Sequence, residues 1–286
     1  MKTHTALITG ASSGIGLHLA REFARHGHPL VLVAPRQDEL VKVASEIEAD
    51  FGVKALVIAR DLQNPDAPLE IAGLLAEKDV VVSILVNNAG FGIRGNSWDI
   101  NIEQDLAMVK LNIEAPLRLT KIFLHSMLAK DCGWILNTAS VAGFMPGPLL
   151  NVYHSTKAFV LSWSQGLASE LKDTSIKVTA LCPGATDTDF FTKAGMEDAK
   201  GFQGSNVMAP QDVAKAGYEG LMSGETIVVP GVMNKAMVEM RRILTQSTMT
   251  EMSKSNYEPT APDDKNRKRG DVEQQAELAD QTISHR

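Results

Sequence analysis

The feature of this sequence that most constrains its fold is a regular alternation between two kinds of segment. Short, mostly apolar runs are separated by longer stretches in which apolar residues recur at helical spacing. Strands buried on both faces of a parallel sheet have this pattern, because helices cover both sides. The repeated strand–helix–strand order therefore predicts an α/β fold with a doubly wound parallel sheet of about seven strands. The expected strands are residues 6–9, 30–34, 55–59, 84–87, 134–138, 178–181 and 227–229, and the clearest helices are residues 17–26, 37–51, 102–128, 153–171 and 211–222.

The chain is long enough for one large domain or two small ones. Its 286 residues contain no internal repeat and no linker before residue 250, so we expect a single domain over residues 1–250 with its core in 3–230. Residues 232–250 are expected to form an amphipathic helix that packs on the core or a subunit interface rather than on a membrane. Residues 251–286 contain 14 charged side chains and few apolar ones. We expect a disordered tail there, because it cannot offset its ordering entropy, and its deletion should leave the chemistry intact.

Composition argues against several classes of protein. A net charge of −6, from 28 basic and 34 acidic residues, argues against nucleic-acid binding. The two cysteines exclude a disulfide scaffold and a four-cysteine zinc site, and they are typical of a cytoplasmic protein. No apolar run reaches the ~18–20 residues of a membrane span, so no integral membrane segment is expected. The histidines show no ligand spacing, and no metal site is expected.

Residues 9–16, TGASSGIG, connect the first expected strand to the first helix. Glycines allow a sharp turn and a close approach of the backbone to a ligand. The N–H groups and the positive dipole end of the following helix favour a pyrophosphate. Such a loop also occurs as a simple tight turn, and no Lys-Ser/Thr pair follows that would indicate a nucleotide-triphosphate loop. The strand–loop–helix context favours a dinucleotide, bound by Gly10, Ser12, Ser13, Gly14, Ile15 and Gly16.

Five further motifs follow the glycine loop in order. Residues 87–90 read NNAG after the fourth strand, Asn112 lies in KLN, Ser140 ends the fifth strand, YHSTK begins at Tyr153, and Pro183-Gly184 with Thr188 follows the sixth strand. In this order and spacing, the motifs resemble the short-chain dehydrogenase/reductase family over roughly residues 3–230. The resemblance implies a Rossmann-type fold and an NAD(P)-dependent oxidoreductase that acts on CH–OH or C=O groups. It also implies a homodimer or homotetramer.

The resemblance further implies roles for individual residues. Lys157 would bind the nicotinamide ribose, and Asn112 would hold a water that links Lys157 to solvent. Asp61, after the third strand, would contact adenine. The other cofactor-binding residues implied are Leu62, Asn88, Ala89, Gly90, Tyr153, Pro183, Gly184 and Thr188.

The chemistry can also be argued from the residues themselves. Tyr153 and Lys157 are four apart, so a helix places both on one face. A phenol with a pKa of about 10 is a poor base near neutrality, but a neighbouring ammonium lowers that pKa and makes proton exchange with an alcohol feasible. Ser140 is placed to hydrogen-bond the substrate oxygen. The expected catalytic set is Asn112, Ser140, Tyr153 and Lys157.

Each of these residues also has a structural interpretation. A Tyr/Lys pair at this spacing is usually a solvated helix face, Ser140 could be a cap, and Asn112 could be a buried hydrogen-bonding residue. His154 follows Tyr153 directly, and adjacent helix positions point about 100° apart. We therefore expect His154 to pack or face solvent rather than to react.

The residues after the second strand bear on the choice of cofactor. An acidic side chain about 20 residues beyond the loop binds an adenosine 2′-hydroxyl, whereas arginine accommodates a 2′-phosphate. Arg36 lies there and no carboxylate stands at the immediate strand end, which favours NADP(H) over NAD(H). Many NADP-preferring relatives carry a basic residue where this chain has Pro35 or Ser13. The alternative is that Arg36 is a solvated residue at a helix start.

Three stretches beyond the strand ends, residues 91–97, 141–152 and 185–206, should surround the substrate. They contain aromatic and methionine side chains and few charges, which favours an apolar carbonyl or alcohol over a small anionic acid. The glycines of the third stretch are typical of a mobile lid. The alternative is that these residues only close loops over the core. The expected substrate-binding residues are Ser140, Phe144, Tyr153 and Phe190.

The main functional prediction is hydride transfer between NADP(H) and the carbonyl or secondary alcohol of a small molecule, with Tyr153 as general acid and base. The alternative is a catalytically silent NADP(H)-binding sensor or scaffold protein. Such a protein would be expected to have lost part of the catalytic set, and this chain retains all of it.

Overall fold

Seven parallel strands form one sheet in the computed structural model, which describes residues 4–204, 206–261 and 267–284. Their order across the sheet is β3-β2-β1-β4-β5-β6-β7, so the winding direction reverses between β1 and β4. The predicted doubly wound parallel sheet is confirmed. The strands are β1 Thr5–Thr9, β2 Leu30–Ala34, β3 Ala55–Ala59, β4 Val82–Asn87, β5 Gly133–Thr138, β6 Ile176–Leu181 and β7 Ile227–Val228.

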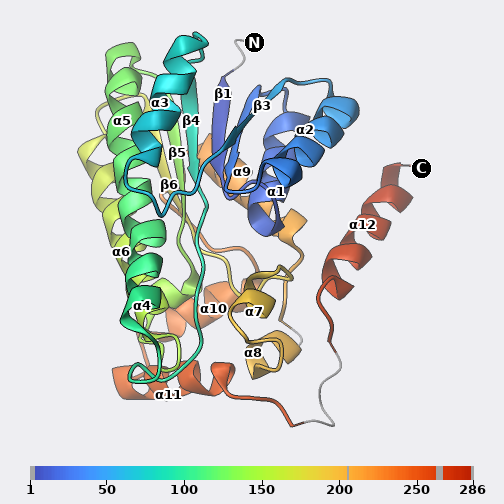
Figure 1. The fold of residues 1–286 in the computed structure, drawn as a ribbon. Helices are drawn as coiled ribbons and strands as arrows, with labels where there is room; N and C mark the ends of the chain where they lie inside the picture. Colours follow the sequence, from blue (N-terminus) through green and yellow to red (C-terminus); the bar gives the residue numbers. More distant parts are fainter. Residues whose placement is uncertain (1–3, 205, 262–266, 285–286) are drawn as a thin grey trace.

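Helices cover both faces of this sheet (Figure 1). Helices α1, α2 and α9 pack on one face, and α3, α5 and α6 pack on the other. In the part of the chain that the structure describes, no helix is long and apolar enough to cross a membrane. The helices are α1 Gly14–Arg25, α2 Gln37–Phe51, α3 Ala67–Glu77, α4 Ile102–Val109, α5 Ala115–Lys130, α6 Asn151–Glu170, α7 Phe190–Lys193, α8 Lys200–Gln203, α9 Pro210–Ser223, α10 Val232–Met240, α11 Gln246–Tyr257 and α12 Asp271–Ser284.

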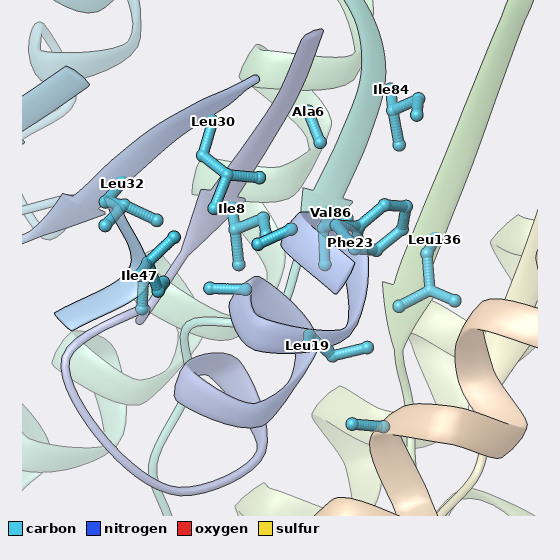
Figure 2. Close-up of a cluster of buried hydrophobic side chains, with 14 of the residues drawn as sticks. Ala6, Ile8, Leu19, Phe23, Leu30, Leu32, Ile47, Ile84, Val86 and Leu136 are labelled. Atoms are coloured by element: carbon cyan, nitrogen blue, oxygen red, sulfur yellow. The ribbon is translucent and has the colours of Figure 1, made fainter. Parts of the chain in front are cut away.

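The strands are apolar on both faces because each face is covered. Successive side chains of a strand point to opposite sides, so Ile8 of β1 packs with the α1 side while its neighbour Leu7 packs with the α5 side. Leu19 and Phe23 of α1 are four residues apart and fully buried, and Figure 2 shows them in one cluster with Ile8 and Val86. This packing fixes the carboxyl ends of the strands along one edge, where the predicted motifs lie.

The helical region expected over 102–128 is divided into two helices. A π-helical segment, Lys110–Glu114, separates α4 from α5 and contains Asn112. Such segments are uncommon and often occur at functional sites. Here the wider turn accompanies a buried Asn112 side chain whose amide contacts the loop after β4.

The C-terminal part of the chain differs from the sequence-based expectation. Residues 232–250 form α10 and the start of α11 rather than one helix, and the segment expected to be a disordered tail contains the rest of α11 and α12. Met249 anchors α11 and is 3% exposed. The buried Asp187 carboxylate accepts hydrogen bonds from the N–H groups at the start of α12. These few anchors order a segment that its average composition predicts to be disordered. Residues 262–266 and 285–286 of the expected tail lie outside the described residues.

Candidate active site

A cleft of about 980 Å³ lies at the carboxyl ends of the strands. Every site residue predicted from the sequence lines this cleft except Asn112 and Phe144. Asn112 lies behind the wall formed by the loop after β4. Phe144 is not brought to the cleft, because its ring packs against the β6–α6 side of the core and under the Arg241 guanidinium, 4.7 Å from the ring centre. Met145, the next residue, lines the cleft instead.

The glycine loop has the geometry of a phosphate site. Gly10 and Gly14 have φ angles of 66° and 54°, in the left-handed region that favours glycine. A Cβ on Gly16 would stand 2.1 Å from the Gly10 carbonyl oxygen, so the close approach requires glycine there too. No side chain caps the N-terminus of α1, which leaves its first N–H groups available to a pyrophosphate. These residues therefore fit a bound dinucleotide.

The NNAG segment is fixed against this loop by Thr9. The Thr9 hydroxyl accepts hydrogen bonds from the backbone N–H groups of Asn88 and Ala89, at 2.9 and 3.0 Å. The Asn88 side-chain amide donates to the Thr9 carbonyl oxygen at 3.1 Å. Asn88 thus ties β4 to β1, and the same contacts hold its backbone at the cleft.

The predicted catalytic side chains converge from three elements. Tyr153 and Lys157 lie on α6, and the Lys157 ammonium donates to the Thr138 carbonyl oxygen at 2.7 Å and lies 5.7 Å from the Tyr153 ring centre. Ser140 lies two residues beyond the end of β5, where it caps a short 3₁₀ turn and accepts a hydrogen bond from the Ala142 N–H at 3.1 Å. The Asn112 amide is bound to both backbone groups of Phe91 and donates to the Thr156 hydroxyl.

Comparison with known proteins identifies the family. A profile described as short chain dehydrogenase matches residues 4–199. The chain belongs to this family. A "Probable NADP-dependent dehydrogenase" of Haemophilus influenzae is similar, with 30% identity over 220 residues that cover 75% of this chain and 86% of that protein.

Solved structures resemble this dehydrogenase over most of its length. A short-chain dehydrogenase from Sphingobium yanoikuyae in complex with NADPH is 33% identical with a TM-score of 0.75, covering 85% of this chain and 97% of that one. The bulky-bulky ketone specific alcohol dehydrogenase from Comamonas testosteroni is 32% identical with a TM-score of 0.71, covering 86% and 97%. As a family member, the protein is a nicotinamide-dependent oxidoreductase that acts on alcohol or carbonyl groups.

Burial controls the pKa values of the dehydrogenase's central pair. It raises the pKa of Tyr153 to about 12, with the Ser140 hydroxyl opposing the rise, and it lowers the pKa of Lys157 to about 8. A low-dielectric site disfavours both the phenolate and the ammonium. The Tyr153 pKa is therefore raised rather than lowered as expected from the nearby Lys157, because desolvation of the buried phenol is the largest effect on it.

His154 packs, as expected, but it also faces the cleft. The residue is 3% exposed, Nδ1 lies 2.8 Å from the Met145 carbonyl oxygen, and Nε2 lies 2.7 Å from the Tyr257 hydroxyl. Burial lowers the pKa of His154, so its imidazole is neutral near pH 7. The side chain next to the candidate general acid is thus hydrogen-bonded to Tyr257, the last residue of α11.

Two arginines line the part of the cleft beside β2 and β3. The Arg36 side chain is 67% exposed and pairs with Glu39, whereas Arg60 pairs with Glu70 at 2.6 Å. Both carboxylates lie on helices that begin after the strand ends. Arg60 is not among the site residues predicted from the sequence. Its position directly before Asp61, a predicted adenine contact, is the sequence signal that could have identified it as a residue of the cleft.

Other lining residues carry no such signal in the sequence. Ser253 and Tyr257 belong to α11, in the segment whose composition predicts disorder. Asn206 and Asn234 line the cleft together, with the Asn206 amide donating to Asn234 at 3.2 Å. No group of three or more metal-ligating side chains occurs among residues 4–204, 206–261 and 267–284.

Proposed function

We propose that this dehydrogenase transfers a hydride between NADP(H) and the carbonyl or secondary alcohol of an apolar small molecule, with Tyr153 as the proton donor and acceptor. One observation carries the proposal. Ser140, Tyr153 and Lys157 line the same cleft as the glycine loop, so a nucleotide and a substrate can meet there. NADPH supplies the hydride when bound.

The protonation of Tyr153 suits the reduction of a carbonyl. With a pKa of about 12, its phenol keeps its proton near neutrality and can donate it to the substrate oxygen as negative charge develops there. The Ser140 hydroxyl holds that oxygen. The Lys157 ammonium orients a ribose hydroxyl and stabilises a transient phenolate. Asn112 supports this arrangement by holding the Phe91 backbone in place.

The preference for NADPH rests on Arg36, with Arg60 near it. Two guanidinium groups at the adenosine end favour a 2′-phosphate over a 2′-hydroxyl. The names of the Haemophilus relative and the Sphingobium structure support the same cofactor. We expect kcat/KM to be higher with NADPH than with NADH, and Arg36→Ala to lower that ratio. A strong NADH preference that Arg36→Ala leaves unchanged would overturn this part of the proposal.

The substrate is apolar because the wall beside Tyr153 is apolar. The centre of the Tyr153 ring lies 5.1 Å from that of the Phe190 ring, and Met145, Leu150 and Met196 line the cleft with it.

Exposed apolar side chains on α4 and α5, including Ile102 and Leu128, support a homodimer or homotetramer built on these helices. A cytoplasmic location is part of the same proposal.

The test is a panel of ketones, aldehydes and β-keto esters with NADPH. We expect saturable turnover of apolar members by the native enzyme. Tyr153→Phe should bind NADPH with unchanged affinity, measured by its fluorescence, and should lose nearly all turnover. Retained turnover in Tyr153→Phe would remove Tyr153 from the chemistry, and NADPH binding without any turnover would favour a sensor.

A further inference from the structure

Helix α11 contributes a wall of the cleft that the proposed chemistry does not use. Ser253 and Tyr257 of α11 line the cleft together with His154 and Tyr153. Both Tyr153 and Tyr257 pack against one apolar cluster that includes Phe191 and Phe202. The pKa of Tyr257 is raised, first by burial and then by its proximity to Tyr153. The two phenols are therefore neighbours in one pocket.

The chain around Tyr257 is fixed by backbone contacts with the region between β6 and α9. Ala199 forms an isolated antiparallel bridge with Pro259, and the Lys200 N–H donates to the Glu258 carbonyl oxygen at 3.1 Å. The Arg94 guanidinium donates to the Tyr257 carbonyl oxygen at 3.2 Å. These bonds hold Tyr257 in place from two directions, so its hydroxyl has a defined position.

The hydrogen bonds of His154 determine which way the Tyr257 proton points. Nδ1 faces the Met145 carbonyl oxygen, which can only accept, so Nδ1 carries the ring proton. The imidazole is neutral, and its Nε2 therefore accepts the hydroxyl proton of Tyr257. The Tyr257 oxygen has no proton left to donate, and it acts as an acceptor toward the cleft.

The Ser253 hydroxyl supplies a hydrogen-bond donor beside the Tyr257 acceptor. Ser253 is 2% exposed, and its Oγ has no hydrogen-bond partner among the described residues. Its hydroxyl lies beside the Tyr257 phenol, whose pKa it lowers against the larger effect of burial. A buried hydroxyl without a partner is costly, so a ligand atom that bonds it would be favoured.

We propose that Tyr257 and Ser253 recognise a hydroxyl group that the substrate carries at a distance from its reacting carbonyl. That hydroxyl donates its proton to the Tyr257 oxygen and accepts one from Ser253. The inference rests on the proposed function and narrows its substrate class to apolar hydroxyketones. A carboxylate fits this point poorly, because Tyr257 offers it no proton, His154 is neutral, and the Lys200 ammonium is held by Glu258 at 2.9 Å.

The experiment uses 2-alkanones from 2-hexanone to 2-undecanone, each with and without a terminal hydroxyl. Because the chain length varies, the series tests different distances between the carbonyl, which reacts at Tyr153, and the hydroxyl, which binds Tyr257 and Ser253. In the native enzyme with NADPH, the ratio of kcat/KM for hydroxyketone over plain ketone should peak at one chain length, at roughly tenfold for one net hydrogen bond. Tyr257→Phe and Ser253→Ala should each bring this ratio close to one at that length.

Tyr218→Phe is the matched control. The Tyr218 hydroxyl also faces a histidine, His28, at 3.3 Å, but Tyr218 lies on α9 outside the cleft lining. This variant should keep the native ratio at every chain length. Circular dichroism and NADPH affinity show whether each variant is folded.

Two results would overturn the inference while leaving the proposed function intact. One is a native enzyme that reduces plain ketones but prefers the hydroxyl at no chain length. The other is an equal loss of kcat/KM for both members of a pair in Tyr257→Phe, which a merely structural role would give. If no ketone is reduced, the proposed function fails, and the inference is then tested by calorimetry of the NADP⁺-saturated protein. Hydroxyketones should bind more tightly than plain ketones, and Tyr257→Phe should remove the difference. Equal binding of the two ketones would overturn the inference.

Discussion

The buried carboxylate of Asp187 accepts a hydrogen bond from the backbone N–H of Gly270 at 2.9 Å, although 83 residues separate the two in the chain. Its other oxygen accepts from the N–H groups of Val272 and Glu273, at 2.8 and 3.2 Å. Asp187 thus caps α12 from outside the helix, with the charge that a helix N-terminus favours. Because Asp187 follows Gly184 by three residues, α12 is tied to the segment proposed to flank nicotinamide.

Asp187→Ala is expected to release α12 from the body of the protein. The loss of three charge-assisted hydrogen bonds should lower the free energy of unfolding by about 1–3 kcal/mol in urea titrations. Limited proteolysis should then cleave between residues 267 and 284 faster than in the native chain. Asp189→Ala is the control, because Asp189 is 42% exposed and bonds only the Arg269 side chain in this region. Equal cleavage of the native and Asp187→Ala chains would show that α12 is held by other contacts.

The sheet is predictable from the sequence because its strands carry local information. A strand such as Leu30–Ala34 is buried along its whole length, so its apolar run is visible without knowledge of its neighbours. The glycine loop and the Tyr153–Lys157 pair are likewise short motifs with fixed spacing. Phe144 shows the limit of this information, because a short 3₁₀ turn directs it away from the cleft and brings Met145 there.

Long-range contacts explain what the sequence does not predict. Tyr257 enters the site through its bond to His154, 103 residues earlier in the chain. The order of α12 depends on Asp187, one buried charge outside the segment whose composition indicates disorder. The Tyr153 pKa depends on burial, which residue spacing does not reveal, so an argument from the nearby Lys157 gives the wrong direction.

Removal of residues 251–286 is expected to damage activity, contrary to what the composition of that segment implies. A chain that ends at residue 250 lacks Ser253 and Tyr257 and opens the cleft beside His154 to water. Its kcat/KM for ketones should fall at least tenfold, whereas a chain that ends at residue 261 keeps α11 and should retain much more activity. Full activity in the shorter chain would show that α11 is dispensable for catalysis, and circular dichroism would confirm that both chains fold.

The ion pairs of Glu273 should make stability depend on pH in the acid range. The hydrogen bond from His18, with further contributions from Arg269, holds the pKa of Glu273 at about 2 against the opposing effect of burial. A carboxyl whose folded pKa is below its unfolded value of about 4.5 stabilises the protein above pH 4.5 and loses that effect as the pH falls toward 2. Native protein should therefore exceed Glu273→Gln in unfolding free energy by roughly 1–2 kcal/mol at pH 7, after discounting for solvent screening. Urea titrations from pH 7 to pH 3 should show this difference shrinking, and a constant difference would contradict the pKa assignment.

Gly16→Ala should block the nucleotide site without a large change in the rest of the fold. A Cβ there would meet the Gly10 carbonyl oxygen at 2.1 Å and the Asn88 amide nitrogen at 2.5 Å, and the backbone oxygen cannot rotate away as a flexible side chain would. The loop must therefore shift, and we expect the Kd for NADPH to rise more than tenfold in a fluorescence titration. Gly73→Ala is the matched control: Gly73 lies within α3 with no atom near its missing Cβ, so alanine should leave the Kd unchanged and stabilise the helix by about 0.5–1 kcal/mol. Native affinity in Gly16→Ala would mean that the pyrophosphate does not depend on this loop, and the assignment of the cleft would have to be abandoned.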